Sequence, residues 1–520
     1  MMFKGSGVVV LGLVFTAACT KPNPAATCSG GVCTDPGHPY CDVDGSIGGE
    51  PNTCIAVSCT AGDFKSCAGS DMAVVCNANG NGYDTQSCAY GCDPSTGCGS
   101  GSGSGSCTAD EVLRCDGEQL VSCNADGTGE VTEACALGCD GTGPRCKGVD
   151  PSNGLATYLD QAAQQGDVVL PDGTTISTDN GTVNGPGGAI AVATTIISQS
   201  NGPMLRVLMA KSFAIGNVRV TGTAALAIVS AGDITITGVL DLSADGLTSG
   251  PGAMTCLNTG AGGSSISGFF KTTPANSGGY PHYTWTVGGG GGGGFGSIGG
   301  SGGSGDTSTA GGAGAINGVA TLVPLRGGCP GGDDRGGPYG GAGGGAVQLV
   351  ANNTVHLVDG GATKGQIHVG GGGGHTGELG RVNLSDTNVV WGSGGGGAGG
   401  GILIEAGTVV LDADTGLMAA GGGGAGWGAC TPAANGTDAP PSASTPLGGA
   451  CSAGTTPTSL GGDGATTANG GTGQTVTSGS GGGGGGGLGR IRINTADAQY
   501  SSQTSSTVRG VVTTAIVQAR

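Results

Sequence analysis

Aromatic and charged residues are scarce in this chain of 520 residues. Phe, Trp and Tyr together make up 3% of the sequence and charged residues 10%, whereas ordinary globular domains carry about 25% charged residues. A chain with so few of either is unlike an ordinary cytosolic enzyme. Basic residues are the scarcer charges, because 18 Lys and Arg stand against 36 Asp and Glu, which gives a net charge of −18. This balance argues against nucleic acid or anionic lipid headgroups as partners.

The apolar run at the N-terminus is short. It extends from Val8 to Phe15, after a single basic residue, Lys4. A run of this length is too short to span a bilayer, and its position is typical of a bacterial export signal. Small residues and then Cys19 follow the run. We therefore expect the chain to leave the cytoplasm.

Residues 1–18 resemble a lipoprotein signal peptide. The resemblance implies that the Cys19 thiol is lipidated, and two or three acyl chains anchor a protein stably. Thr16 departs from the Leu usually found three residues before the cysteine. The alternative is cleavage by an ordinary signal peptidase near Ala18, which would leave Cys19 as a free thiol. Thr20 replaces the Asp that retains such proteins in the inner membrane of some enteric bacteria, so we expect the outer membrane or cell surface.

Cysteine and glycine are abundant, and they occupy different parts of the chain. Seventeen of the 21 cysteines lie in residues 1–150, whereas 95 of the 121 glycines lie in residues 151–520. Cysteine at this density indicates an oxidising compartment. The count is odd, and lipidation of Cys19 leaves an even number to form disulfides.

The N-terminal cysteines form a repeat. Residues 59–98 and 107–146 each hold six cysteines, at spacings of 8, 9, 12, 4, 6 and 8, 8, 12, 4, 7. An anchor segment with a four-Cys module (residues 19–58) precedes them, and a Gly/Ser linker (residues 99–106) joins the two repeats. Modules this small depend on disulfides, each worth about 2–4 kcal/mol. The even counts predict bonds within modules, with the connectivity open, and hence a stapled stalk.

The glycine-rich domain, residues 155–520, contains aligned strands. It begins with a helical pattern at Leu155 and Leu159 and an apolar run, Val168–Leu170. Three later segments each hold three short strands of about 20 residues in total, the period of a β-helix coil. Their aligned apolar pairs are Leu226/Ile228, Val347/Leu349 and Ile402/Ile404; Ile234/Ile236, Val355/Leu357 and Val409/Leu411; and Leu240/Leu242, Ile367/Val369 and Leu417/Ala419. A fourth, partial copy holds Ile491 and Ile493.

The entry sequence GDVVLPDG, with the aligned coils that follow, resembles a pectate-lyase-like right-handed parallel β-helix. The expected fold class is therefore all-β: a right-handed parallel β-helix with Gly-rich loop insertions, preceded by small disulfide-rich modules. In such a coil one face of each strand stacks aliphatic residues inside. This interior needs few aromatic residues.

Three insertions separate the coils, at about residues 245–345, 370–400 and 420–487. Each leaves the coil at the equivalent corner, so we expect one Gly-rich lobe. The runs 288–294 and 481–487 have no side chains to pack and carry the highest backbone entropy cost. They are either disordered tips or extended polyproline-II-like bundles, as in some Gly-rich antifreeze proteins and phage adhesins.

The four remaining cysteines lie in the first and third insertions. We expect each pair to close its own loop, as Cys256–Cys329 and Cys430–Cys451. The N-terminal modules contain no Cys-x-x-Cys pair, which makes zinc sites there unexpected. His356, His368 and His375 belong to different strands of one coil. We expect no metal site and no cofactor.

The β-helix resemblance implies an alternative function, a polysaccharide lyase or glycoside hydrolase. Asp333-Asp334 with Arg335, His375 and Arg490/Arg492 loosely resemble elements of polygalacturonase-like enzymes. The Asn-Thr-Asp element of those enzymes is missing, and the Asp pair lies in an insertion. The sequence therefore predicts no catalytic residues, and the simpler interpretation is a solvated turn with a local Asp–Arg pair.

Binding is the more plausible activity. Tyr280, His282, Tyr283 and Trp285 lie close together in an aromatic-poor chain, and aromatic faces can stack on sugar rings or anchor a protein partner. These four residues are the candidate binding platform. The alternative is that they form the small core of the largest insertion.

Residues 1–520 as a whole resemble the Gly-rich, Cys-repeat exported lipoproteins of Gram-negative bacteria. The sequence thus predicts a cell-envelope lipoprotein with a structural or adhesive role and no catalysis. Its expected partners are the membrane, through the N-terminal lipid, and a polysaccharide or another surface protein.

Overall fold

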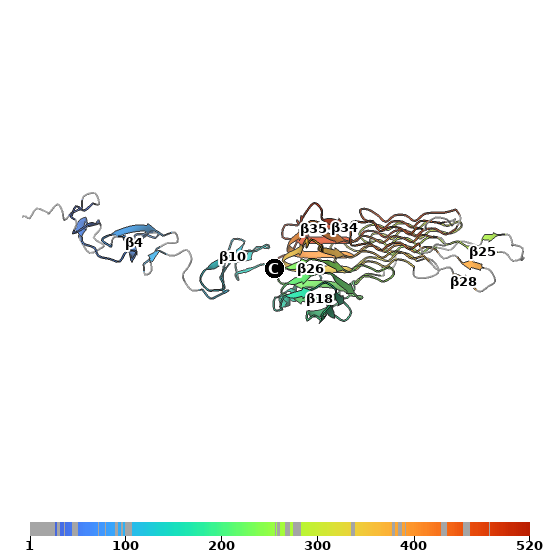
Figure 1. Cartoon of the computed structure of the whole chain (residues 1–520), viewed down its shortest axis with the longest axis horizontal. Helices are drawn as coiled ribbons and strands as arrows, with labels where there is room; N and C mark the ends of the chain where they lie inside the picture. The colour runs from blue at the N-terminus through green and yellow to red at the C-terminus, as the bar shows by residue number, and fades with distance from the viewer. Residues whose placement is uncertain are drawn as a thin grey trace, which may run out of the picture. The chain divides into compact units, whose positions relative to one another are not determined.

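The protein is nearly all-β, with about 35% of the chain in strands and 2% in helix (Figure 1). The computed structural model describes residues 27–28, 32–35, 37–43, 50–70, 72–78, 80–88, 92–94, 97–98, 107–254, 256, 260–265, 271–273, 282–333, 339–376, 380–382, 387–389, 392–427, 434–450, 458–477 and 479–520. The chain divides into two units, one of residues 1–116 and 120–133, the other of residues 117–119 and 134–520.

The cysteine-rich segment consists of short antiparallel strands. The four-Cys module pairs two strands, and each six-Cys repeat contains one three-stranded sheet and one two-stranded sheet. The duplicated sequence therefore adopts a duplicated pairing pattern. The strands are β1 (Tyr40–Asp42), β2 (Thr53–Ile55), β3 (Phe64–Cys67), β4 (Met72–Cys76), β5 (Tyr83–Ser87), β6 (Cys92–Asp93), β7 (Gly97–Cys98), β8 (Val112–Asp116), β9 (Gln119–Cys123), β10 (Glu130–Ala134), β11 (Cys139–Asp140) and β12 (Arg145–Cys146).

Disulfides close within the modules, as the even counts predict. In the first six-Cys repeat the first cysteine bonds the third, the second bonds the fifth and the fourth bonds the sixth. The second repeat has the first and last of these bonds, and its other two cysteines, Cys115 and Cys139, are also disulfide-bonded. The bonds are Cys28–Cys41, Cys33–Cys54, Cys59–Cys76, Cys67–Cys92, Cys88–Cys98, Cys107–Cys123 and Cys135–Cys146.

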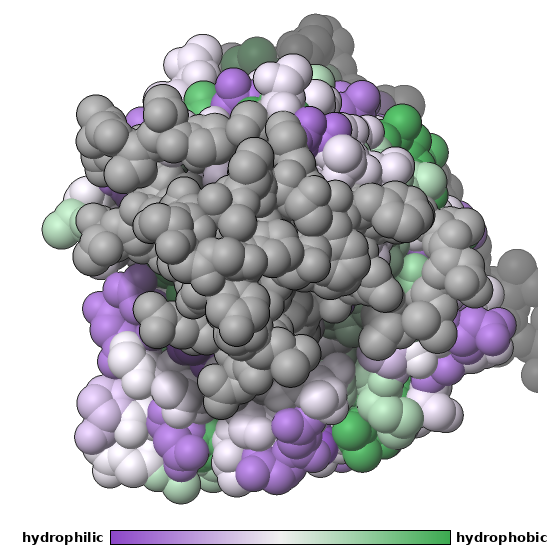
Figure 2. Space-filling model, turned by 90° about the vertical axis from the view of Figure 1, so that its right-hand side faces the viewer, coloured by the Kyte–Doolittle hydropathy of each residue, from purple (hydrophilic) through white to green (hydrophobic). Residues whose placement is uncertain are grey.

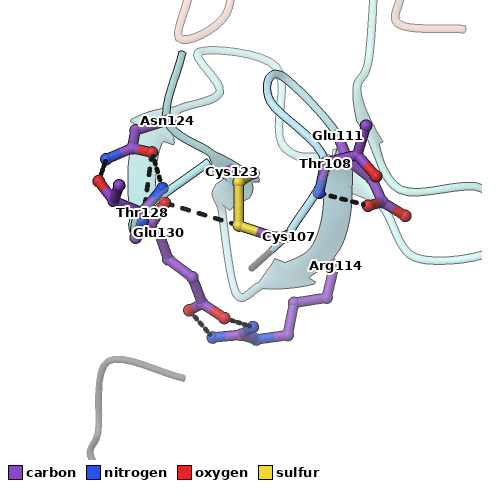
Figure 3. Close-up of a disulfide and its surroundings, with 9 residues drawn as sticks. Cys107, Thr108, Glu111, Arg114, Cys123, Asn124, Thr128 and Glu130 are labelled. Atoms are coloured by element: carbon purple, nitrogen blue, oxygen red, sulfur yellow. Dashed lines mark hydrogen bonds and ion pairs between the residues drawn. A yellow bond between two sulfur atoms is a disulfide. The ribbon is translucent and has the colours of Figure 1, made fainter. Parts of the chain in front are cut away.

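Polar contacts supplement the disulfide Cys107–Cys123 (Figure 3). Arg114 of β8 donates two hydrogen bonds, of 2.9 and 2.8 Å, to the carboxylate of Glu130 on β10. The hydrogen bond from Arg114 holds the pKa of Glu130 below its usual range. Asn124 accepts hydrogen bonds from the backbone amides of Thr128 and Gly129. Disulfides and side-chain hydrogen bonds here provide stability that a larger domain obtains from its apolar core.

The second unit is dominated by two large sheets whose strands run mostly parallel. One sheet has eleven strands and the other eight. The eleven are β13 (Val168–Leu170), β17 (Ala193–Ile197), β18 (Leu205–Ala210), β19 (Phe213–Ile215), β21 (Ala225–Ser230), β22 (Ile234–Ile236), β26 (Ala346–Leu357), β30 (Gly401–Leu411), β32 (Arg490–Thr495), β33 (Ser501–Ser502) and β35 (Val511–Ile516). The eight are β14 (Thr174–Ser177), β15 (Val183–Gly185), β16 (Gly188–Ala189), β20 (Val218–Thr221), β23 (Val239–Asp241), β27 (Gln366–His368), β31 (Gly416–Met418) and β34 (Thr507–Arg509).

The strand registers confirm the alignment predicted from the apolar pairs. Leu226 pairs with Val347, and Val347 pairs with Ile402. Ile402 in turn pairs with Ile491 of the fourth copy. Successive copies therefore stack strand on strand, because matched alternation points the same side chains to the same face.

The aligned residues form one aliphatic core. The members of the predicted pairs are fully buried together, and among the described residues buried in this core Phe213 is the one aromatic. This packing accounts for the low aromatic content of the chain.

A second core lies on the opposite face of β18, β21, β26 and β30 from the first. It contains Leu155 and Leu159, the latter on α1 (Ala156–Ala162), packed against β18, β21, β26 and β30. The buried carboxylate of Glu405 fixes the segment before α1, accepting hydrogen bonds from the amide and hydroxyl of Ser152 at 2.9 and 2.7 Å. Gln348 donates a third bond to it, at 2.7 Å. This segment and α1, together called the cap, are thus tied to the stacked strands by both apolar and polar contacts.

The last residue closes onto the same cap. Arg520 exchanges backbone hydrogen bonds with Gly148. Its guanidinium donates two hydrogen bonds, of 3.0 and 2.7 Å, to Asp160 of α1. The end of the chain and the cap therefore support each other.

The insertions gather in one Gly-rich lobe, as predicted. Backbone hydrogen bonds join the first insertion to the second (Gly290 to Ser393) and the third to both others (Gly484 to Gly290, Gly422 to Gly397). The lobe extends away from the stacked strands in Figure 1.

The glycine runs of the lobe are ordered, extended segments rather than disordered tips. In the first run, every third amide donates a hydrogen bond to the same neighbouring segment, and three segments are used in turn. Gly289 donates to Gly303 and Gly292 to Gly300; Gly290 donates to Ser393 and Gly293 to Gly396; Gly291 donates to Gly263 and Gly294 to Gly260. A three-residue cycle is the signature of the polyproline-II helix, which has three residues per turn. We call the hydrogen-bonded glycine-rich segments of the three insertions the glycine bundle.

Glycine is required at interior positions of the glycine bundle such as Gly289 and Gly292. A methyl group built on Gly289 would overlap the carbonyl oxygen of Gly482, and one on Gly292 would overlap that of Gly485. The hydrogen bonds between segments offset the entropy cost of ordering glycine. Glycine richness here is therefore a packing requirement.

Candidate functional sites

A small sheet lies at the far end of the lobe (Figure 1). It contains β24 (Lys271–Thr273), β25 (His282–Trp285), β28 (Gly380–Val382) and β29 (Thr387–Val389), in the order β24-β25-β29-β28. We call it the tip sheet. Strand β25 pairs antiparallel with β24 and parallel with β29, so the first and second insertions build it together.

Three residues of the candidate binding platform belong to the tip sheet. His282, Tyr283 and Trp285 lie on β25, and Tyr280 lies outside the described residues. Figure 2 views the molecule from this end, where hydrophilic and hydrophobic residues mix around the rim.

A polar cavity of about 450 Å³ opens where the lobe meets the stacked strands. Its lining includes Asp245, His375, Asn435 and Asp438, from all three insertions. The Asp438 carboxylate accepts hydrogen bonds from the amides of Gly246 (3.0 Å) and Gly373 (2.7 Å). This carboxylate therefore joins two insertions across the cavity wall.

A second cavity, of about 410 Å³, shares Thr248 with the first and includes Arg219 and Ser243 in its lining. Behind it, Arg219, Asp241 and His368 form a row on adjacent strands β20, β23 and β27. Arg219 donates to the Asp241 carboxylate, and His368 Nδ1 lies 3.0 Å from the other oxygen.

The Asp241 carboxyl is strongly held in its charged form. Burial raises its pKa, but the hydrogen bonds from His368 and Ser243 outweigh burial and hold the pKa well below its usual range. His368 is 3% exposed, and its Nε2 has no hydrogen-bond partner among the described residues. The row thus holds an ion pair between Arg219 and Asp241, and at its other end the Nε2 of His368 has no partner within the described part of the chain.

The described residues among those compared with polygalacturonase-like enzymes have separate surroundings. Asp333 accepts a hydrogen bond from the amide of Gly340 at 3.0 Å, and His375 lines the first cavity. Arg490 instead donates to the Asn317 carbonyl. Arg492 donates to the Thr514 carbonyl at 3.2 Å, and Asp334 and Arg335 lie outside the described residues.

The three histidines considered for a metal site have separate surroundings. His356 Nε2 lies 3.1 Å from Asp412, His368 pairs with Asp241, and His375 lines the first cavity. Within the described ranges, the one group of three potential ligands with closely spaced atoms is Cys28, Cys33 and Cys54. All three are disulfide-bonded.

Of the remaining candidates, Cys256 and Cys329 are joined by a disulfide, the pairing expected from the sequence. Cys19, Cys430 and Cys451 lie outside the described residues. No helix in the described part of the chain is long and apolar enough to cross a membrane.

The Arg219–Asp241–His368 row was missed from the sequence, although a signal for it existed. Asp241 lies between the aligned Leu240 and Leu242, and His368 lies between the aligned Ile367 and Val369. Arg219 lies between Val218 and Val220, which precede the aligned segments. Extending the alignment back to Val218 and Val220, and to the outward positions, would have placed all three in one row. Comparison with models of protein families, with curated proteins and with solved structures found no match.

Proposed function

We propose that this chain is an exported, surface-anchored adhesive lipoprotein in which the glycine bundle carries a binding surface, the tip sheet. The observation that supports this proposal best is the three-residue hydrogen-bond cycle, because it makes a long glycine-rich segment an ordered support. Two insertions combine at the end of that support. An ordered support that ends in a small sheet is suited to presenting a ligand-binding surface.

In this proposal the stacked strands of the second unit form a right-handed parallel β-helix that supports the glycine bundle. Three stacks of parallel strands follow one another in the chain, with β18, β19 and β20 continuing as β21, β22 and β23. Crossovers between parallel strands are right-handed in about 98% of cases. In this arrangement the three insertions extend from one corner of a rigid coil.

The binding surface of the proposal is β25 with the preceding Tyr280. Aromatic side chains bind sugar rings by stacking and bind protein partners through large apolar contacts. A polysaccharide or another surface protein is the partner class that we favour. Cys19 would supply the membrane anchor through its lipid.

Retention and cleavage assays test this proposal together. The full-length chain with Cys19→Ser, which removes only the lipid acceptor, is incubated with immobilised cell-wall and matrix polysaccharides. We expect retention without release of oligosaccharides. Cleavage of a polysaccharide would replace the adhesive function with the enzymatic one.

The variant Tyr283→Ala/Trp285→Ala locates the binding surface. We expect it to lose retention at least tenfold while keeping its circular dichroism spectrum. Trp427→Ala is the matched control, because Trp427 is half-buried in the third insertion, away from β25 in the chain. Loss of folding in the double variant alone would mean that the aromatic residues form a small core instead, and equal retention by all three proteins would refute the tip as the binding surface.

A further inference from the structure

Two arginines come together on the flank of the stacked strands, and no carboxylate of the described residues pairs with either. Arg490 begins β32 and is only 8% exposed. Its Nε donates to the carbonyl of Asn317 at 3.0 Å and its Nη2 to the carbonyl of Gly318 at 3.3 Å. Arg326 donates from Nη2 to the Asn317 side-chain oxygen at 2.8 Å. Both guanidiniums thus bind one two-residue turn.

The surroundings of this pair are partly apolar. The Arg490 guanidinium lies over the Phe295 ring, 5.6 Å from its centroid, and Phe295 is fully buried. Burial lowers the pKa of both arginines, and the charge of Arg326 lowers that of Arg490 further. The two positive charges therefore repel each other in an environment that screens them less than water does.

Nothing in the described part of the chain neutralises the pair. Within the described residues, the hydrogen bonds of both guanidiniums go to Asn317 and Gly318, and neither arginine forms an ion pair with a carboxylate there. This is unusual in a chain with 36 acidic and 18 basic residues. Arg490 is buried and Arg326 is half-buried, yet neither has a described side-chain nitrogen that is both fully buried and unpaired.

The position of the pair is fixed before any ligand arrives. Leu322 and Leu325, in the loop before Arg326, are buried in the second core. Gln199 accepts a hydrogen bond from the Leu325 amide at 2.8 Å and donates one to the Leu325 carbonyl at 2.9 Å. A fixed fork of donors loses little entropy when it binds a ligand.

We propose that Arg326 and Arg490 form a binding site for an oxyanion carried on a larger molecule, such as a uronate carboxylate or a phosphate of a surface polymer. Guanidinium groups match carboxylate and phosphate oxygens with paired hydrogen bonds. An anion placed between the two cations would remove their repulsion. The exposed side chains of Ile316 and Val319, 56% and 48% exposed beside the turn, would contact the rest of that molecule. The site is independent of the tip sheet.

Titration calorimetry with small oxyanions tests the site. Sodium phosphate and sodium galacturonate are titrated separately into the full-length chain carrying Cys19→Ser, at an ionic strength held constant with sodium chloride. We expect saturable binding of one equivalent of at least one of them. Binding of phosphate alone would identify a phosphate as the ligand group, and binding of galacturonate alone a carboxylate.

Two glutamine variants assign the binding to this pair. Arg326→Gln should weaken it at least tenfold, because Arg326 contributes one of the two cations. Arg492→Gln is the matched control, two residues beyond Arg490 on the same strand, and should leave the affinity unchanged. If Arg326→Gln does not fold, Arg326→Lys, which keeps the charge and loses the fork, should weaken binding instead. Failure of both anions to bind the unmodified site, or equal loss in the Arg492 variant, would overturn the proposal.

Discussion

The most demanding prediction concerns a single methyl group in the glycine bundle. Gly291 donates a hydrogen bond to the Gly263 carbonyl at 3.0 Å and accepts one from the Gly332 amide at 2.7 Å. A methyl group on Gly291 would overlap the carbonyl oxygen of Gly312. Because that obstacle is backbone, Gly291→Ala must move a neighbouring segment.

The expected cost follows from three contributions. Two weakened hydrogen bonds cost about 2 kcal/mol together, and overpacking adds about 1–3 kcal/mol. The reduced entropy of the unfolded chain returns about 0.4–1 kcal/mol. Gly291→Ala should therefore lower the free energy of unfolding of the lobe by about 2–4 kcal/mol.

Gly312→Ala is the control on the same bundle. Gly312 is exposed, and a methyl group there would have no atom within 4 Å. This variant should be neutral or stabilise the lobe by about 0.4–1 kcal/mol. The two substitutions have the same chemistry and opposite expected signs.

Urea unfolding followed by tryptophan fluorescence measures the difference. All three tryptophans, Trp285, Trp391 and Trp427, lie in the insertions, so the signal reports on the lobe. With a typical slope of about 2 kcal/mol per molar urea, the midpoint for Gly291→Ala should fall by about 1–2 M. Equal midpoints for the two variants would refute the packing described for the runs.

Three further predictions concern the rest of the second unit. Replacing both Cys256 and Cys329 with Ser should destabilise the first insertion by about 2–4 kcal/mol, seen as faster proteolysis within residues 245–345; an unchanged digestion rate would contradict this. Glu405→Gln should leave a hydrogen-bond donor of the cap unpaired and lower the stability of the cap by about 2 kcal/mol. The rate of amide exchange in α1 should then rise about 30-fold, whereas Asp167→Asn should leave this rate unchanged. The folded-state pKa of Asp241 lies below its unfolded value of about 4, so its contribution to stability is present above about pH 4 and is lost as the pH falls through the folded value. Asp241→Asn should therefore reduce the fall in melting temperature between neutral and acid pH. An unchanged dependence of melting temperature on pH would argue against the His368 pairing.

The stacking of the strands could be predicted from sequence because side chains encode it. Leu226, Val347 and Ile402 alternate with outward residues in the same way, and burial of one face leaves a single register. The helix near Leu159 was visible for the same reason, since its apolar spacing fits one helical face.

The hydrogen-bond partners of the glycine runs could not be predicted. Gly290 and Gly291 have identical local sequence, yet one donates to Ser393 and the other to Gly263. A residue without a side chain carries no pattern that names its neighbour. The contacts of Glu405 with Ser152 and of Arg490 with Asn317 were equally hidden, because each joins polar residues that lie far apart in the sequence.

Hydrogen exchange of the run 481–487 tests the ordered glycine bundle most directly. All seven of its amides donate hydrogen bonds to other segments, with distances of 2.8–3.0 Å. Measured by mass spectrometry on the full-length chain, their exchange should be slowed by orders of magnitude relative to an unfolded glycine peptide. Complete exchange of this run within seconds would show that the lobe is not an ordered support and would contradict the account.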